Sequence, residues 1–300
     1  MNAIEIRNLS KSFRGMYAVD HLNMTVPQGA IYGFIGENGS GKSTTEKLIC
    51  GHLVPDGGEI KLFGRDYSDP GVRVRVGALI ENAGCFPSSS VYQNLRMQTI
   101  NLGLEDPDAE IRRVLEIVRM EEHANLKFKK CSLGMKQRIG IAMALLGDPA
   151  LLILDEPING LDTDGMRIMR EILVDITQKY GCTVLISSHI LGELEKIATH
   201  YCIIRQGKMI LEMSAAEMDS RAQVFTSLKT RDMAGAEAVL RKAYPTVRAE
   251  EGYLRVYDVD DTAGIVSLLM KHGHPVSEIH KNKIGLEEYY VELMSRKEDE

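Results

Sequence analysis

A glycine-rich segment near residue 40 constrains this chain more than any other feature. Residues 36–43 read G-E-N-G-S-G-K-S, which fits the phosphate-binding P-loop pattern G-x-x-x-x-G-K-[ST]. The apolar run 30–35 before it predicts a buried strand, and residues 43–53 after it have the apolar spacing of a helix. Strand, glycine loop and helix is the order that the motif requires. The sequence therefore predicts a nucleotide-binding site.

The role of each P-loop residue follows from phosphate chemistry. Glycines let backbone N–H groups converge on phosphate oxygens, and the unpaired amides of the following helix face the same anion. We expect Lys42 to reach the β- and γ-phosphates and the Ser43 hydroxyl to bind Mg²⁺, which makes Lys42 a catalytic candidate as well. The expected nucleotide-binding residues of the loop are Gly36, Asn38, Gly39, Ser40, Gly41, Lys42, Ser43 and Thr44.

Length and composition narrow the class of protein. The 300 residues suggest about two domains, and the net charge of −6 favours neither nucleic acid nor anionic lipid as a partner. The five cysteines form no C-x-x-C pair, so they indicate neither a disulfide framework nor a zinc site, and they fit a reducing cytosol. No apolar run approaches the roughly 20 residues that span a bilayer. If the protein acts at a membrane, another chain must do the spanning.

Two further strand ends carry residues that suit phosphate chemistry. The aliphatic run 151–154 is closed by Asp155 and Glu156, which puts carboxylates at the edge where open α/β sheets bind ligands. Asp155 suits Mg²⁺ through its water shell, and Glu156 suits the orientation or deprotonation of an attacking water. His189 follows the expected strand 183–187 and faces the γ-phosphate side of the same edge. A charged strand terminus and a structural histidine are the alternatives, and the P-loop in the same chain favours the functional interpretation.

The pattern of elements changes twice along the chain. Residues 1–64 alternate like strands, residues 89–147 have helical periodicity, and from about residue 220 the order becomes β-α-β-β-α-β, which suggests a ferredoxin-like unit. We therefore expect a nucleotide-binding domain at residues 1–219 with a helical subdomain at about 89–147. We expect a C-terminal α+β domain at residues 220–300 that carries no catalytic motif.

Two candidate residues have weaker signals. Phe13 is expected in the loop between the first two strands, where an aromatic ring could stack on adenine or could equally belong to the core. Ser132 is placed as the N-cap of a helical run, and with Gly134 it could face an anion at a helix N-terminus or serve only as a cap.

Five motifs in this order make the chain resemble the nucleotide-binding subunit of ABC transporters over about residues 1–215. They are the P-loop, C-S-L-G-M-K-Q-R at 131–138, L-L-I-L-D-E-P at 151–157, N-G-L-D at 159–162 and S-S-H at 187–189. The resemblance implies a P-loop NTPase with a mixed sheet core, an antiparallel β subdomain and a helical subdomain. It implies ATP and Mg²⁺ as cofactors, and hydrolysis of ATP to ADP and phosphate coupled to transport.

The resemblance also implies partners and roles. Two subunits, either two copies of this chain or this chain and a homologous subunit, would face head to tail with ATP between them. They would work with an integral membrane permease and lie in the cytoplasm at the inner face of the cell membrane. Ser132 and Gly134 would complete the partner's ATP site. By position, Phe13 matches the adenine-stacking aromatic, Asp155 the Mg²⁺-associated acid, Glu156 the catalytic glutamate, Asp162 the D-loop aspartate and His189 the switch histidine.

Departures from the family pattern point to one branch. The signature motif is usually L-S-G-G-Q, but Cys131, Leu133 and Met135 replace three of its five positions, and Glu81 stands where the Q-loop glutamine is common. The stretch I-E-N-A-G at 80–84, with S-L-G-M-K-Q-R, is similar to the bacitracin- and lantibiotic-resistance branch. That branch exports or expels peptide antibiotics through a separate membrane subunit. We expect Glu81 to bind nucleotide through the Mg²⁺ shell.

Two alternatives remain open from the sequence. The chain could be a soluble ABC ATPase that acts on ribosomes or nucleic acid, or an exporter subunit for another substrate. The single cassette, the lack of a heptad run and the negative charge favour transport. A permease is then expected to dock near residues 81–95, which include Phe86, Pro87 and Tyr92.

Replacing Glu81 tests whether this residue couples nucleotide to transport or only points to solvent. A carboxamide can bind the Mg²⁺ shell as a carboxylate does, so Glu81→Gln should keep ATP hydrolysis within about tenfold. Glu81→Ala should impair transport more than it impairs ATP binding. ATPase rate and resistance to the transported peptide, measured side by side, check this expectation. Transport by Glu81→Ala at the wild-type level would exclude the coupling role.

Overall fold

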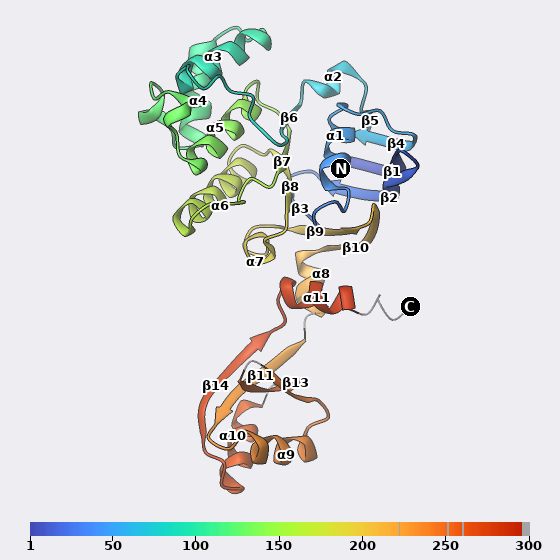
Figure 1. Cartoon of the computed structure of the whole chain (residues 1–300), viewed down its shortest axis with the longest axis vertical. Coiled ribbons are helices and arrows are strands. Elements are labelled where there is room, and N and C mark those ends of the chain that lie inside the picture. Colours follow the sequence, from blue (N-terminus) through green and yellow to red (C-terminus); the bar gives the residue numbers. More distant parts are fainter. Residues whose placement is uncertain (222, 251, 260, 296–300) are drawn as a thin grey trace. The chain divides into compact units, whose positions relative to one another are not determined.

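The computed structural model describes residues 1–221, 223–250, 252–259 and 261–295. The chain divides into two compact units, Met1–Ala215 and Ala216–Glu300 (Figure 1). The domain boundary that the sequence predicts, after residue 219, falls inside helix α8 (Ala215–Arg221). Residues 296–300 of the predicted C-terminal domain lie outside the described residues.

A six-stranded mixed sheet forms the centre of the first unit, with strand order β10-β9-β3-β8-β7-β6. All neighbouring strands are parallel except β10, which pairs antiparallel with β9. Parallel strands end at one edge of the sheet, so the ends of β3, β7 and β8 lie side by side. The strands are β3 (Ile31–Ile35), β6 (Val76–Leu79), β7 (Leu151–Asp155), β8 (Thr183–Ser188), β9 (His200–Arg205) and β10 (Lys208–Ser214). The mixed sheet core predicted from the sequence is confirmed.

An antiparallel sheet forms the second layer, with order β2-β1-β4-β5, as the family resemblance implies. Its strands are β1 (Asn2–Phe13), β2 (Met16–Pro27), β4 (Gly57–Leu62) and β5 (Arg65–Asp66). On β2, Leu22, Met24 and Val26 are buried while their neighbours face out, which is the alternation expected of a sheet with one covered face. One apolar core joins this sheet to β3 and to helix α1 (Lys42–Ile49).

Helix α1 ends earlier than the sequence suggests. The apolar spacing extends to Leu53, but the helix stops at Ile49. Gly51 has a φ of +69° and its N–H bonds the carbonyl of Leu48 at 3.0 Å, while the N–H of His52 bonds the carbonyl of Lys47 at 2.8 Å. A left-handed glycine with such bonds terminates a helix regardless of the side chains that follow.

The helical subdomain lies apart from the antiparallel sheet (Figure 1). Side-chain caps fix where its helices begin: Ser90 and Gln93 form a capping box at α3, and Asp106 accepts from the N–H of Ala109 at α4. The elements of this region are α3 (Val91–Asn101), α4 (Pro107–Ile117), η1 (Glu121–His123), η2 (Phe128–Lys130) and α5 (Leu133–Leu145), followed after β7 by α6 (Thr163–Gln178). Short helices α2 (Pro70–Arg73) and α7 (Leu191–Leu194) complete the first unit.

The second unit has a core of its own. Its order is β11 (Val224–Thr230), α9 (Met233–Ala243), β12 (Val247–Glu250), β13 (Tyr253–Tyr257), α10 (Thr262–Lys271), β14 (Val276–Lys283) and α11 (Leu286–Ser295). The strands pair antiparallel in the order β12-β13-β11-β14, with the element order of the ferredoxin-like motif. Leu228, Leu240, Leu254 and Ile265 are fully buried between this sheet and its helices.

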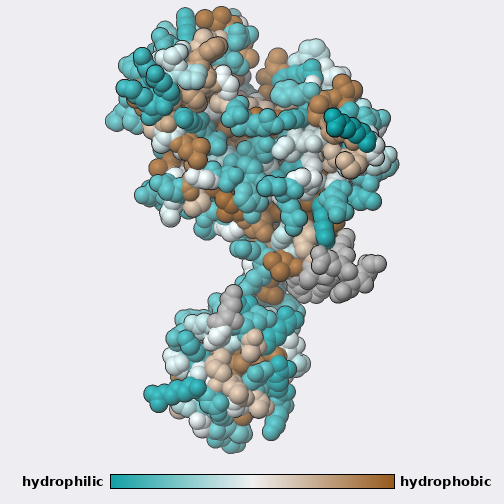
Figure 2. All heavy atoms as spheres, in the orientation of Figure 1, coloured by the Kyte–Doolittle hydropathy of each residue, from teal (hydrophilic) through white to brown (hydrophobic). Residues whose placement is uncertain are grey.

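One face of the molecule is mainly polar. Hydrophilic residues cover most of the face that Figure 2 shows, and apolar residues form small separate groups there. Within the described residues, no helix combines the length and the apolar character needed to cross a bilayer.

Removing the second unit tests whether the two cores are independent. Because each unit has its own apolar core, a chain that ends after residue 220 should bind ATP within about threefold of the full chain. Titration with a fluorescent ATP analogue, after circular dichroism has established that the shortened chain is folded, provides the measurement. A folded truncation that no longer binds ATP would contradict the independence of the units.

Candidate active site

The P-loop includes a glycine, Gly41, whose backbone conformation other residues rarely adopt. Gly41, which precedes α1, has a φ of +112°. A Cβ atom at Gly41 would collide with the carbonyl oxygen of Ala18. No side chain caps α1, so the N–H groups of its first turn remain available to an anion.

The P-loop contains two buried polar side chains, those of Ser40 and Lys42. Ser40 is 5% exposed, and its hydroxyl has no hydrogen-bond partner. Lys42 is 6% exposed, and its ammonium donates to the carbonyl oxygens of Gly36 at 2.6 Å and Glu37 at 3.1 Å. A buried cation and an unpaired hydroxyl fit the phosphate chain of a nucleotide. The cavity here, called the P-loop cavity below, has a volume of about 250 Å³ and is lined by Ala18, Asn38, Gly39, Gly41, Lys42, Ser43, Thr44, Asp155 and Glu156.

Asp155 joins the P-loop helix to the neighbouring strand ends. The Ser43 hydroxyl donates to one carboxylate oxygen at 3.0 Å, and the Ser187 hydroxyl donates to the other at 2.8 Å. Hydroxyl and carboxylate oxygens are the ligands that Mg²⁺ prefers, usually completed by substrate phosphates. The Ser43 hydroxyl and the Asp155 carboxylate fit a Mg²⁺ ion whose remaining ligands are phosphate oxygens and water. Among the described residues, no three or more His, Cys, Asp or Glu side chains are grouped so that they could hold a metal ion.

Glu156 lies between two basic side chains. Its carboxylate contacts His189 Nδ1 at 2.8 Å and lies 3.9 Å from the Lys42 ammonium. The backbone of Glu156 has a φ of +49°, a left-handed conformation that is costly for a residue other than glycine and that persists mainly at functional sites. A carboxylate held in this way at the strand end can orient or deprotonate a water beside the γ-phosphate.

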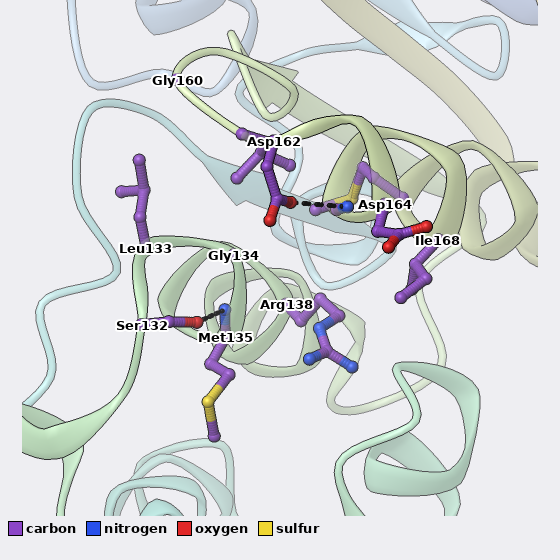
Figure 3. Close-up of a pocket in the computed structure, with 12 residues that line it drawn as sticks. Ser132, Leu133, Gly134, Met135, Arg138, Gly160, Asp162, Asp164 and Ile168 are labelled. Atoms are coloured by element: carbon purple, nitrogen blue, oxygen red, sulfur yellow. Dashed lines mark hydrogen bonds between the residues drawn. The ribbon is translucent and has the colours of Figure 1, made fainter.

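A second cavity, of about 420 Å³, lies between the starts of α5 and α6 (Figure 3). We call it the signature cavity. Ser132 caps α5 by accepting from the N–H of Met135 at 3.2 Å, and Asp162 caps α6 by accepting from the N–H of Gly165 at 2.8 Å. Gly134 also lines the cavity. The signature cavity and the P-loop cavity share no lining residue. The predicted site residues therefore line two separate cavities within one chain.

Phe13 is not a core residue. It is the last residue of β1 and not part of a loop, and 45% of its surface is exposed. The Lys11 ammonium lies 5.6 Å from the centre of its ring. Phe13 does not line the P-loop cavity, so its contact with adenine stays a prediction.

Glu81 has a partner that the sequence did not suggest. Its carboxylate accepts from the Lys47 ammonium at 2.6 Å, and this hydrogen bond lowers the pKa of Glu81. Glu81 also has a positive φ, +65°, and does not line the P-loop cavity. The Glu81 side chain is 62% exposed. Its binding to the Mg²⁺ shell stays a prediction, and so does the alternative in which it points to solvent and has no role.

Ser187 is the site residue that the sequence analysis missed. It is fully buried, donates to Asp155, and accepts from the N–H of Glu156 at 3.1 Å. The available signal was its place at the end of an aliphatic strand, two positions before His189. A polar residue near the end of a buried strand, beside two carboxylates, is a candidate for holding those carboxylates by hydrogen bonds.

Comparison with known proteins identifies the family of this chain. The ABC transporter family model matches residues 19–159. The chain is 35% identical over 297 residues to bacitracin transport ATP-binding protein BcrA of Bacillus licheniformis, covering 97% of each protein. This chain belongs to the ABC transporter family. It is an ATPase subunit of that family.

Other relatives of this ABC protein support the same assignment. Lantibiotic transport ATP-binding protein SrtF of Streptococcus pyogenes is 38% identical over 224 residues, which is 75% of this chain and 96% of that protein. Among solved structures, cbiO1 from Clostridium perfringens, part of the ABC transporter complex cbiONQ, aligns with a TM-score of 0.67 at 27% identity. The alignment covers 73% of this chain and 91% of that one.

Substitutions at Lys42 and Glu156 should separate binding from turnover. Lys42→Ala removes the buried cation that is expected to face the phosphates. ATP binding should therefore weaken by about tenfold or more, and hydrolysis should be abolished. Glu156→Gln keeps the shape but loses the base, so ATP should bind normally while kcat falls by about 100-fold or more. Equilibrium binding and phosphate release, measured on both variants, check this. Normal turnover by Glu156→Gln would remove Glu156 from the catalytic role.

Proposed function

We propose that this ATPase powers the export or expulsion of a peptide antibiotic, of the bacitracin or lantibiotic type, through a separate membrane permease. The observation that carries this proposal is the similarity to BcrA, a bacitracin transport protein. The alignment spans 297 residues, so it includes the second unit as well as the cassette. The similarity to SrtF, a lantibiotic transport protein, supports the same substrate class.

The reaction uses ATP with Mg²⁺. Ser43 and Asp155 are the residues that would hold the ion, which supplies positive charge against the phosphates. Lys42 adds a second positive charge. When ATP binds, the Lys42 ammonium would leave the carbonyl oxygens of the loop and donate to phosphate oxygens instead. Glu156 receives the proton of the attacking water, and His189 holds the Glu156 carboxylate in position. Phe13, half exposed near the hairpin turn of β1 and β2, would stack on adenine.

The complete site takes two subunits. Ser132, Gly134 and Asp162 line a cavity that is separate from the P-loop cavity of the same chain. In a head-to-tail pair, formed with a second copy or a homologous subunit, the start of α5 in one subunit would face the phosphates bound by the other. The N-terminus of α5 suits this role because its amides and dipole favour an anion.

We expect the permease to contact the segment that comes after β6. A cavity of about 370 Å³ is lined by residues that include Glu81, Cys85, Phe128 and Lys136. Phe86, in the same segment, is 59% exposed. An exposed aromatic beside a cavity suits a protein partner. The Lys47–Glu81 pair joins this segment to α1, so nucleotide at the P-loop and permease at the segment would affect each other. The chain would thus lie at the inner face of the membrane.

The two alternatives have less support. Action on ribosomes or nucleic acid is not favoured, because the relatives described above are transport proteins and the net charge is −6. Another exported substrate is the closer competitor, since Nod factor export ATP-binding protein I of Cupriavidus pinatubonensis is 35% identical over 213 residues.

Resistance of a sensitive host tests the substrate class. Cells that produce the chain together with the permease of its own gene neighbourhood should tolerate more bacitracin or lantibiotic than cells that produce the Glu156→Gln variant with the same permease. The variant is the matched control because it should assemble but not turn over. Equal sensitivity of the two strains to every peptide antibiotic, with ATPase activity and permease co-purification intact, would contradict the proposed substrate.

A further inference from the structure

A one-turn helix follows the loop that carries His189. This helix, α7, has only four residues, and a helix of that length is not stable through its own hydrogen bonds. Leu194, its last residue, is fully buried and packs on β3, where a Cβ atom added to Gly33 would lie 2.0 Å from the Leu194 Cδ2 atom. The position of the His189 loop therefore depends on the side chains that fix α7.

An ion pair joins α7 to another helix. The Glu193 carboxylate of α7 pairs with the Arg170 guanidinium of α6. Their side chains are only 14% and 21% exposed, so water screens this attraction less than it screens a surface pair. The Lys196 ammonium also contacts the Glu193 carboxylate, at 2.6 Å, but Lys196 lies only three positions further along the chain. Arg170 is thus the partner that connects α7 to a different element.

The helix that carries Arg170 is firmly placed. It has 16 residues, its first turn is capped by Asp162, and its buried face includes Met169, Ile172 and Leu173. Such a helix is held by tertiary packing along its whole length. The ion pair therefore attaches a short helix, which is marginal by itself, to a long helix with an apolar face of its own.

His189 needs this support because its own contacts are few. Its ring contacts the Glu156 carboxylate at 2.8 Å, and its side chain is about half exposed. The next residue, Ile190, donates its N–H to the Ser188 hydroxyl at 3.0 Å. A displacement of about 1 Å would take the His189 ring out of hydrogen-bond range, and a misplacement of that size can lower a rate by up to about 100-fold.

We propose that Arg170 and Glu193 are positioning residues of the ATPase reaction: their ion pair fixes α7 on α6 and so holds His189 against the Glu156 carboxylate. Neither residue lines the P-loop cavity, so the pair acts on hydrolysis and not on ATP binding. This inference rests on the roles proposed above for Glu156 and His189, and it does not depend on the exported substrate.

Substitutions on α6 test the ion pair. Arg170→Met removes the charge and keeps most of the length, so kcat should fall by about tenfold while the KM for ATP changes little. Arg170→Lys keeps the cation, so its kcat should stay within about threefold of the wild type. Arg167→Met is the matched control, because Arg167 pairs only with Asp164 and Glu171 of α6 itself, and it should keep both parameters.

A second substitution shows whether the pair acts through His189. In the His189→Ala background, Arg170→Met should cause no further loss of the single-turnover rate beyond about twofold, because the ring that it misplaces is absent. Losses that multiply would overturn the inference, since they would indicate a general structural role, and so would wild-type kcat in a folded Arg170→Met protein. If Arg170→Met does not fold, Glu193→Gln decides, because it also breaks the charge pair and should lower kcat in the same way.

His189→Ala alone separates this inference from the proposed mechanism. Hydrolysis by His189→Ala at the wild-type rate would show that the role proposed for His189 is wrong, and the positioning role would fall with it. Slow hydrolysis by His189→Ala together with normal hydrolysis by Arg170→Met and Glu193→Gln would overturn the positioning role only.

Discussion

The two hydrogen bonds to Asp155 hold the catalytic centre together. One comes from Ser43 at the start of α1 and the other from Ser187 at the end of β8, so a single carboxylate ties the phosphate-binding helix to two neighbouring strands. The arrangement places negatively charged groups close together. Glu156 follows Asp155 directly, and the phosphates of ATP would add further negative charge. Lys42, buried and bonded to the carbonyl oxygens of its own loop, offsets part of this charge, and Mg²⁺ would offset the rest. Binding of Mg²⁺ together with ATP would therefore keep the charges of this site balanced.

The features predictable from the sequence are those encoded by local patterns. The P-loop, the aliphatic run that ends in Asp155 and the strand before His189 each carry their own periodicity and end signals, and the structure brings them to one sheet edge because parallel strands share it. Contacts between distant side chains have no such local signal. The bond from Lys47 to Glu81 crosses 34 positions, and Ser187 meets Asp155 across 32. The early end of α1 depends on the left-handed backbone of Gly51, which outweighs the apolar spacing beyond it.

Helix caps have two uses in this protein. Ser132 and Asp162 satisfy the first amides of α5 and α6, a structural task that serine and aspartate perform in many helices. In the proposed head-to-tail pair the same two residues would face the nucleotide of the partner subunit, so the geometry that starts each helix would also present its N-terminus to an anion. Among the described residues of the second unit we identify no such site, and its apolar core is separate from that of the first unit.

We expect a complete ATP site to need two chains, because the P-loop cavity and the signature cavity of one chain share no lining residue. The most direct measurement is the mass of Glu156→Gln by size-exclusion chromatography with light scattering, with Mg²⁺ and ATP at saturation and without nucleotide. We expect a monomer without nucleotide and a dimer with ATP. A further Ser132→Arg substitution, which places a bulky side chain at the start of α5, should prevent the dimer while ATP still binds. A Glu156→Gln protein that binds ATP to saturation and stays monomeric would contradict it.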